Sequence, residues 1–219
     1  IVGLENLSDL NETITIDRDM YDRLYTEGAS LAGFGAGDEV KAIDILYGVM
    51  LPSGAECCVG LAQHLFGSEE NFVAKMNEKV AELGMGSTHF VTCTGLHDEN
   101  HYTTVRDLTK LLSYALQNDT FRQIYCTSEY TTSATASAPE GLHFLSTMFK
   151  KMDSPAVNGG EIEGGKTGYT SKAGNTLVTA VERDGVRFIV VVMKAKGTHY
   201  TDTKAMLDYG FALHAAGKI

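Results

Sequence analysis

The segment 177–193 constrains the fold more than any other part of this chain. Two β-prone runs, residues 177–182 and 186–193, flank the triplet Arg183-Asp184-Gly185. An Asp-Gly pair between two such runs is typical of a β-hairpin with a tight turn. Within the second run, residues 188–192 are apolar on both faces, so we expect this strand to be central in an antiparallel sheet.

Helical patterns dominate the rest of the chain. Residues 1–7 have the pattern of the end of a helix, residues 13–16 predict a short strand, and the glycine-rich stretch 28–37 predicts a loop or an irregular strand. Apolar spacing and capping residues predict helices from Asp38, from Glu56 to about Phe66, from Ser68, from Thr104, and from Thr201 or Asp202. Residues 128–138 predict a strand or a surface loop. We therefore expect an α/β (α+β) fold, an antiparallel sheet with a helical cluster packed on it.

The composition is that of an ordinary globular protein. Of the 219 residues, 43% are hydrophobic and 21% are charged, and no linker divides the chain, so we predict a single domain over residues 1–219. The net charge of −10 argues against non-specific nucleic-acid binding. No apolar run approaches the roughly 20 residues that span a bilayer.

The cysteines and histidines do not have the spacing of a metal site. No two cysteines form a Cys-x-x-Cys pair, so we expect structural thiols, with a disulfide left open. The four cysteines are Cys57, Cys58, Cys93 and Cys126. His89, His97 and His101 resemble a metal cluster at first sight, but Thr94-Gly95 interrupts them, which favours packing roles in a loop.

Two short elements carry the chemistry that we predict. Residues 166–168 are Lys-Thr-Gly, which offer a positive charge, a hydroxyl and a close approach to the backbone, as a carboxylate site at a strand edge needs. Ser53-Gly54 follows Pro52 in a turn between two predicted helices. Together the two elements suggest serine acyl-transfer chemistry. Taken alone, Ser53 is more simply a turn residue and Lys166 a solvated charge.

Longer stretches of sequence follow one another in an order that one protein family shares. They are residues 84–90 (Gly-Met-Gly-Ser-Thr-His-Phe), 94–98 (Thr-Gly-Leu-His-Asp), 101–104 (His-Tyr-Thr-Thr), 166–170 (Lys-Thr-Gly-Tyr-Thr), 172–175 (Lys-Ala-Gly-Asn), 200–203 (Tyr-Thr-Asp-Thr) and 208–211 (Asp-Tyr-Gly-Phe). Together they resemble the serine-type D-Ala-D-Ala carboxypeptidases, low-molecular-mass penicillin-binding proteins of the peptidase S11 type. The resemblance covers nearly the whole chain and implies a β-lactamase/transpeptidase-like fold.

The site that this resemblance implies has three motifs, Ser-x-x-Lys, Ser-Gly-Asn and Lys-Thr-Gly. In the family, the first serine is acylated by the terminal D-Ala-D-Ala peptide and its lysine acts as the base. Ser53 matches the serine of the second motif and would relay protons. Lys166 would attract the substrate's terminal carboxylate, Thr167 would donate a hydrogen bond, and Gly168 would permit close pairing with the peptide. The backbone N–H of Tyr169 would supply half of an oxyanion hole.

The chain departs from this pattern in two places. Ser-x-x-Lys occurs nowhere in the 219 residues, so the nucleophile and the base are absent. We expect the first motif to stand within about ten residues before Ile1, in a segment that the chain has lost. The second motif reads Ser53-Gly54-Ala55, without the asparagine amide. Glu56 would partly substitute for that amide, although an acid that favours the helix dipole is the simpler interpretation.

The resemblance thus implies a bacterial, extracytoplasmic DD-carboxypeptidase that trims peptidoglycan stem peptides, and we expect this chain by itself to be inactive. The expected partners are D-Ala-D-Ala peptides and β-lactams, without metal, cofactor or nucleic acid, and a membrane surface reached through a segment after Ile219 stays open. Two rivals also stay open. One is a non-catalytic module that binds peptidoglycan peptides through Lys166 and Thr167, which Ala55 favours. The other is a class A-like β-lactamase, against which the similarity of residues 84–98 argues.

Overall fold

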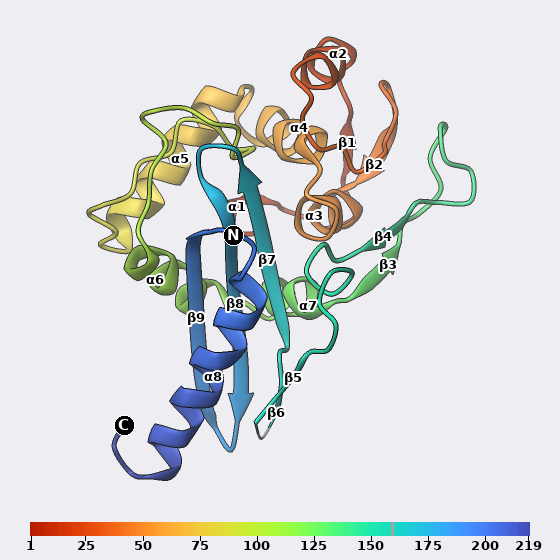
Figure 1. Cartoon of the computed structure of the whole chain (residues 1–219). Coiled ribbons are helices and arrows are strands. Elements are labelled where there is room, and N and C mark those ends of the chain that lie inside the picture. Colours follow the sequence, from red (N-terminus) through yellow and green to blue (C-terminus); the bar gives the residue numbers. More distant parts are fainter. Residues whose placement is uncertain (159) are drawn as a thin grey trace. The chain divides into compact units, whose positions relative to one another are not determined.

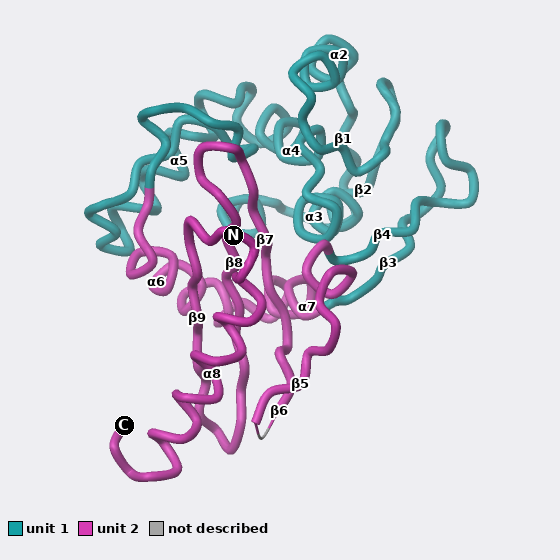
Figure 2. The backbone as a smooth tube through the Cα atoms, in the orientation of Figure 1, with its two compact units in different colours: residues 1–102, 127–146 teal, residues 103–126, 147–219 magenta. Residues whose placement is uncertain are grey.

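The computed structural model describes residues 1–158 and 160–219, which form two compact units. Unit 1 contains residues 1–102 and 127–146, and unit 2 contains residues 103–126 and 147–219 (Figure 2). The chain passes from one unit to the other three times, so the units are not successive domains joined by one linker. The single domain over residues 1–219 stays a prediction.

Unit 1 consists of helices and two short antiparallel strand pairs (Figure 1). Its helices are α1 (Val2–Asn6), α2 (Arg18–Thr26), α3 (Ala42–Met50), α4 (Ala55–Phe66) and α5 (Glu69–Glu82). Strand β1 (Thr13–Thr15) pairs with β2 (Glu39–Lys41), and β3 (Glu129–Thr131) pairs with β4 (His143–Leu145). The structure confirms the predicted strand at residues 13–16, the loop at 28–37 and the helices expected near Glu56 and Ser68.

Local sequence explains where two of these helices begin. The Ser68 hydroxyl accepts a hydrogen bond from the N–H of Asn71 at 3.2 Å at the start of α5. The Asp17 carboxylate accepts one from the N–H of Met20 at 2.9 Å at the start of α2. Such side chains satisfy backbone donors that the first helical turn leaves without a partner. The capping residue therefore fixes the start of each helix.

The helix predicted to begin at Asp38 begins at Ala42 instead, so its predicted start is wrong. The residues before Ala42 form β2, in which Val40 pairs with Ile14 of β1. Asp38 is 2% exposed, and its carboxylate accepts a hydrogen bond from the N–H of Gly35 at 2.8 Å. An aspartate that binds loop donors and a β-branched residue that pairs in a strand both compete with helix formation.

Unit 2 is built on an antiparallel sheet in which β7 (Gly164–Thr170), β8 (Gly174–Arg183) and β9 (Val186–Ala195) follow in that order. It also contains α6 (Val105–Ala115), α7 (Asp119–Cys126), α8 (His199–Ala215) and the paired short strands β5 (Ala156–Val157) and β6 (Gly160–Glu161). The turn between β8 and β9 consists of Asp184 and Gly185, with φ angles of +52° and +78°. Positive φ at both positions is the signature of a type I′ turn, which confirms the predicted hairpin.

Strand β9 is an outer strand of this sheet, and the prediction that it is central is wrong, because β8 occupies that place. Both faces of β9 are nevertheless covered, since α8 packs on one and α6 on the other (Figure 1). Phe188 of β9 contacts Phe211 of α8 with ring centroids 4.8 Å apart. A strand that is apolar on both faces thus indicates cover by helices, and does not reveal its position in the sheet.

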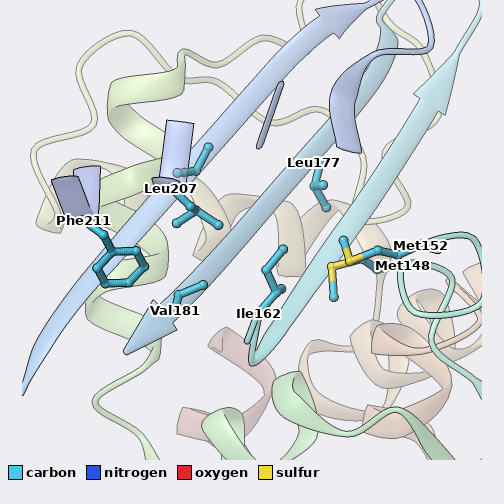
Figure 3. Close-up of a cluster of buried hydrophobic side chains, with 8 residues drawn as sticks. Met148, Met152, Ile162, Leu177, Val181, Leu207 and Phe211 are labelled. Atoms are coloured by element: carbon cyan, nitrogen blue, oxygen red, sulfur yellow. The ribbon is translucent and has the colours of Figure 1, made fainter. Parts of the chain in front are cut away.

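The hydrophobic core of unit 2 joins the sheet to α8 and to the segment before β5. Figure 3 shows its side chains, which are Met148, Met152, Ile162, Leu177, Val181, Val190, Leu207 and Phe211. Leu177 and Val181 of β8 and Leu207 of α8 are fully removed from solvent. Because residues four apart on a strand share a face, β8 presents both of its core residues to the same side. This burial anchors the strand that pairs with β7.

The structure has the mixed class of helices and antiparallel sheet that the sequence predicts. The last helix starts at His199, so a start at Thr201 or Asp202 is wrong. The Asp202 carboxylate lies inside the first turn and accepts a hydrogen bond from the Thr198 hydroxyl at 2.6 Å. In the described parts of the chain, no helix combines the length and the apolar character needed to cross a membrane.

Candidate active site

The two predicted elements lie in different units, Ser53 in unit 1 and Lys166–Gly168 in unit 2. Ser53 lies in the turn between α3 and α4 and is partly exposed. Its φ of +64° is uncommon for a residue with a Cβ atom and carries strain. Non-glycine residues in this conformation persist where the surrounding structure imposes it, and they cluster at functional sites.

Backbone hydrogen bonds hold the Ser53 turn on its C-terminal side. The N–H of Gly54 donates to the carbonyl oxygen of Gly48 at 2.9 Å. The N–H of Ala55 donates to the carbonyl oxygen of Ser30 at 2.8 Å. The turn is therefore fastened both to the end of α3 and to the glycine-rich loop 28–37.

Glu56 lies in the first turn of α4, as predicted, but its side chain is fully buried. Its Oε1 atom accepts hydrogen bonds from the N–H groups of Ala32 at 2.7 Å and Gly33 at 3.0 Å. Burial raises the pKa of Glu56, although the hydrogen bonds from Gly33 and Ala32 act in the opposite direction. The two sequence interpretations of Glu56, as a substitute for an amide and as an acid at the helix dipole, both missed its contact with the loop.

Lys166 and Thr167 lie in the middle of β7, opposite Val178 and Leu177 of β8. The Lys166 Nζ atom donates a hydrogen bond to the carbonyl oxygen of Thr167 at 3.1 Å, which places the ammonium group beside the next residue of the strand. The Thr167 Oγ1 atom is 2.7 Å from Oγ1 of Thr147. A cation and a hydroxyl on one strand are the two kinds of donor that a carboxylate binds.

The glycines of β7 are required for different reasons. A Cβ atom on Gly164 would overlap the carbonyl oxygen of Tyr125, and one on Gly165 would overlap Sδ of Met148. These two glycines let β7 approach its neighbours in unit 2. A Cβ atom on Gly168 would meet only Cβ of Thr176, at 3.8 Å, an ordinary contact. The packing of the strand does not need glycine at position 168, which favours ligand approach as its role.

The outer edge of β7 has the character of a peptide-binding edge. Within residues 1–158 and 160–219, no strand pairs with β7 on the side away from β8. Tyr169 on this strand is 70% exposed. An edge strand presents N–H and C=O groups that can add an extended peptide as a further strand. This edge fits the pairing expected at Gly168 and the donor expected at the N–H of Tyr169.

Two of the three histidines that resemble a metal cluster contact backbone groups of their own loop. His89 Nδ1 lies 2.8 Å from the carbonyl oxygen of Asn100, and His101 Nδ1 accepts a hydrogen bond from the N–H of Val91 at 3.2 Å. These contacts confirm loop-packing roles for both histidines. All four cysteines are free thiols. No cluster of three or more His, Cys, Asp or Glu side chains that could hold a metal occurs among the residues that the structure describes.

Two residues that contact these elements were not predicted from the sequence. Thr147 contacts Thr167 from a position 20 residues earlier, and no motif in the sequence marks it. Glu56 carries a weak signal, since it stands between Ala55 and Cys57 in an otherwise apolar stretch of α4. An acid among apolar neighbours in a helix often reaches inward to a buried donor.

Comparison with known proteins gives the relatives of the chain. A model of the family described as D-alanyl-D-alanine carboxypeptidase (peptidase S11) matches residues 5–197. A D-alanyl-D-alanine carboxypeptidase of Streptomyces sp. (strain K15) is 32% identical over 221 residues, covering 97% of this chain and 75% of the relative. DacC of Escherichia coli (strain K12), which has the same name, is 29% identical, covering 92% of this chain and 49% of the relative.

A solved structure agrees with these relatives. The Streptomyces K15 DD-transpeptidase superposes with a TM-score of 0.84 at 30% identity, covering 97% of this chain and 84% of that one. This likeness confirms the predicted transpeptidase-like fold class. The chain spans three quarters of the Streptomyces relative and about half of the E. coli relative. The range that matches the family model contains Ser53 and residues 166–169.

Proposed function

The chain belongs to the D-alanyl-D-alanine carboxypeptidase family, peptidase S11, and on that premise we propose that it carries two of the three active-site motifs of such an enzyme. The observation that supports this most is the family match over residues 5–197, in which Lys-Thr-Gly falls on an edge strand. The substrate is a peptidoglycan stem peptide that ends in D-Ala-D-Ala, and β-lactams compete for the site. Because peptidoglycan lies outside the cytoplasmic membrane, the protein acts extracytoplasmically.

In the proposed reaction, Lys166 attracts the terminal carboxylate of the peptide and Thr167 donates a hydrogen bond to it. The peptide lies along the edge of β7, where Gly168 leaves room for its backbone. The N–H of Tyr169 stabilises the oxyanion that forms at the scissile carbonyl. Residues 166–169 therefore bind and orient the substrate.

Ser53 moves a proton. A serine oxygen attacks the carbonyl, the C–N bond to the terminal D-Ala breaks, and the leaving amine takes the proton that Ser53 relays. Water then attacks the ester, which releases the shortened peptide and restores the serine. The attacking serine and its lysine base belong to the Ser-x-x-Lys motif, which these 219 residues do not contain. We expect the 219 residues by themselves to leave β-lactams and peptides unreacted, because a nucleophile and its base act as a unit.

A peptide-binding module without catalysis is the second candidate. The observation in its favour is Ala55, which stands where the family motif has an asparagine and which has no side-chain donor or acceptor. Such a module would bind D-Ala-D-Ala peptides through Lys166 and Thr167 and would never cleave them.

The test measures D-Ala release from an acylated Lys-D-Ala-D-Ala tripeptide. It compares the 219-residue chain with the same chain joined upstream to the Ser-x-x-Lys segment of a family member. Release by the joined version alone supports the carboxypeptidase. Binding of the tripeptide without release by either version supports the module. Sustained turnover of a chromogenic cephalosporin by the joined version would instead favour a β-lactamase.

A further inference from the structure

The carboxyl group of Glu56 lies next to the Ser53 turn and is removed from solvent. Glu56 follows Ser53 by three residues and is 0% exposed. One carboxyl oxygen, Oε1, accepts the N–H groups of Ala32 and Gly33. Both donors belong to the loop whose Ser30 carbonyl accepts the N–H of Ala55. The Glu56 side chain and the Ala55 backbone of α4 thus both form hydrogen bonds with this loop, at neighbouring residues.

The second oxygen of Glu56, Oε2, is buried and has no hydrogen-bond partner among the residues that the structure describes. It lies against Gly54, since a Cβ atom built on Gly54 would be 3.0 Å from it and 2.7 Å from Cβ of Ala32. Gly54 is therefore enclosed between the carboxyl group and the loop. A buried carboxyl oxygen without a partner is costly, and such a group calls for an explanation beyond stability.

The conformation of Ser53 needs this support. Its positive φ is strained for a residue with a Cβ atom, so the turn relaxes unless its surroundings oppose the change. The residue that follows Ser53 is Gly54, on which Glu56 and Ala32 both pack. The hydrogen bonds from Ala32 and Gly33 keep the loop, and with it the enclosure of Gly54, in place.

We infer that Glu56 is a positioning residue for Ser53. Its carboxyl group fastens the loop to the start of α4 and thereby holds Ser53 in the left-handed conformation that proton relay requires. This inference rests on the role proposed for Ser53. Glu56 therefore maintains the geometry of the Ser53 turn and does not contact the substrate.

The test compares Glu56→Ala and Glu56→Gln with Asp44→Ala as a matched control. Asp44 is also a buried acid of unit 1, 1% exposed, and its carboxylate accepts the Tyr130 hydroxyl at 2.6 Å and the N–H of Ser133 at 3.1 Å. Removing it costs a similar pair of hydrogen bonds without touching the loop that packs on Gly54. A purely structural role for Glu56 predicts the same behaviour for both alanine variants.

Two readouts separate positioning from stability. In the 219-residue chain, NMR follows the backbone amide resonances of Ser53 and Gly54, which Glu56→Ala should shift and Asp44→Ala should leave in place. In the version joined to a Ser-x-x-Lys segment, Glu56→Ala should slow acylation by a β-lactam about tenfold to a hundredfold, with initial binding unchanged. Glu56→Gln keeps an Oε1 acceptor for Ala32 and Gly33 and should restore most of the rate.

The inference is overturned if Glu56→Ala leaves the Ser53 and Gly54 resonances in place, or if Asp44→Ala slows acylation as much. If Glu56→Ala does not fold, Glu56→Asp replaces it, because the shorter side chain withdraws from the loop while keeping the acid. A wild-type joined version that no β-lactam acylates refutes the proposed function. The resonance measurement in the 219-residue chain still decides on Glu56 in that case.

Discussion

The Ser53 turn in unit 1 and the Lys166–Gly168 segment in unit 2 are held in place by different kinds of contact. The segment lies in a continuous ladder with β8, in register from Gly164 opposite Ala180 to Thr170 opposite Gly174. Ser53 in the turn has a strained φ. The turn depends on a loop whose Ala32, 24 positions before Glu56 in the chain, donates a hydrogen bond to the Glu56 side chain. The proposed binding groups thus stand on a regular element, and the proposed proton relay stands on a strained turn that contacts with a distant loop help to maintain.

Gly164→Ala should have the largest effect, because it disrupts the packing of β7, the strand that carries Lys166–Gly168. The new Cβ atom would overlap the carbonyl oxygen of Tyr125, a backbone atom that cannot rotate away. We expect the free energy of unfolding to fall by about 3 kcal/mol. Gly168→Ala is the matched control, and it should keep stability near wild type while weakening peptide binding. Urea unfolding followed by circular dichroism measures the stability of both variants. An equal loss of stability in the two would contradict our assignment of the two glycines.

Asp38→Ala tests whether the unit that contains the Ser53 turn depends on contacts between loops that are distant in the chain. The Asp38 carboxylate accepts the N–H of Gly35 at 2.8 Å, the N–H of Ser137 at 2.9 Å and the Thr135 hydroxyl at 3.0 Å. Alanine leaves these donors without their acceptor, and we expect a loss of about 2 kcal/mol in the free energy of unfolding. Stability within error of wild type in urea unfolding would show that the loops hold without this contact.

The pH dependence of stability should separate Asp38 from Glu56. Burial acts to raise the pKa of Asp38, but hydrogen bonds from Ser137, Gly35 and Thr135 outweigh it and lower the pKa. The stability that Asp38 contributes is present above its unfolded pKa and is lost as pH falls through the lower folded pKa. The raised pKa of Glu56 gives the opposite slope, since stability falls as pH rises from the unfolded pKa to the folded one.

Two substitutions isolate these slopes. Asp38→Asn should flatten the loss of stability on the acid side, and Glu56→Gln should remove the loss above the ordinary carboxyl pKa. Urea unfolding over a pH series measures both effects. A change of the same sign in the two variants would contradict the opposite pKa directions.

Lys166→Ala should affect function and spare the fold. Lys166 is partly exposed on β7, so its removal should change the free energy of unfolding by less than about 0.5 kcal/mol. Losing the charge that attracts the terminal carboxylate should weaken peptide binding about tenfold, or about 1.4 kcal/mol. Calorimetric titration with an acylated Lys-D-Ala-D-Ala tripeptide tests this. Unchanged affinity would remove Lys166 from the site.

Ser53→Gly and Ser53→Ala should show the smallest effect, which measures the strain itself. Glycine adopts a positive φ without penalty, whereas alanine keeps the strain and loses the hydroxyl. We expect the glycine variant to be more stable than the alanine variant by about 1 kcal/mol. Equal stability of the two variants would mean that Ser53 is not held in the left-handed region in solution.

The sequence predicts the surroundings of the Lys166–Gly168 segment better than those of the Ser53 turn, for a physical reason. The hairpin that supports β7 depends on Asp184 and Gly185, two adjacent residues whose conformational preferences are local. The Lys-Thr-Gly segment pairs in the same sheet, so a local pattern was enough to place it. Its contact with Thr147 could not be predicted, because the two threonines are 20 positions apart in the chain.

The Ser53 turn depends on contacts with residues that are distant in the chain, which no local sequence pattern reveals. The sequence places Ser53 between two helices, but the burial of Glu56 depends on the N–H groups of Ala32 and Gly33, which a distant loop supplies. The wrong start of the helix at Asp38 has the same cause, since loop donors compete for that side chain. The central place predicted for β9 was wrong because its two apolar faces reflect cover by α6 and α8, which says nothing about whether strands pair along both of its edges.

We propose that this family member carries the second and third motifs and reacts only where a Ser-x-x-Lys segment supplies the nucleophile. The most direct measurement is the intact mass after incubation with a β-lactam, for the 219-residue chain beside the version joined to such a segment. We predict a covalent adduct on the joined version alone, located on the serine of the added motif. An adduct on the 219-residue chain would contradict the claim, because a residue within these units would then be the nucleophile.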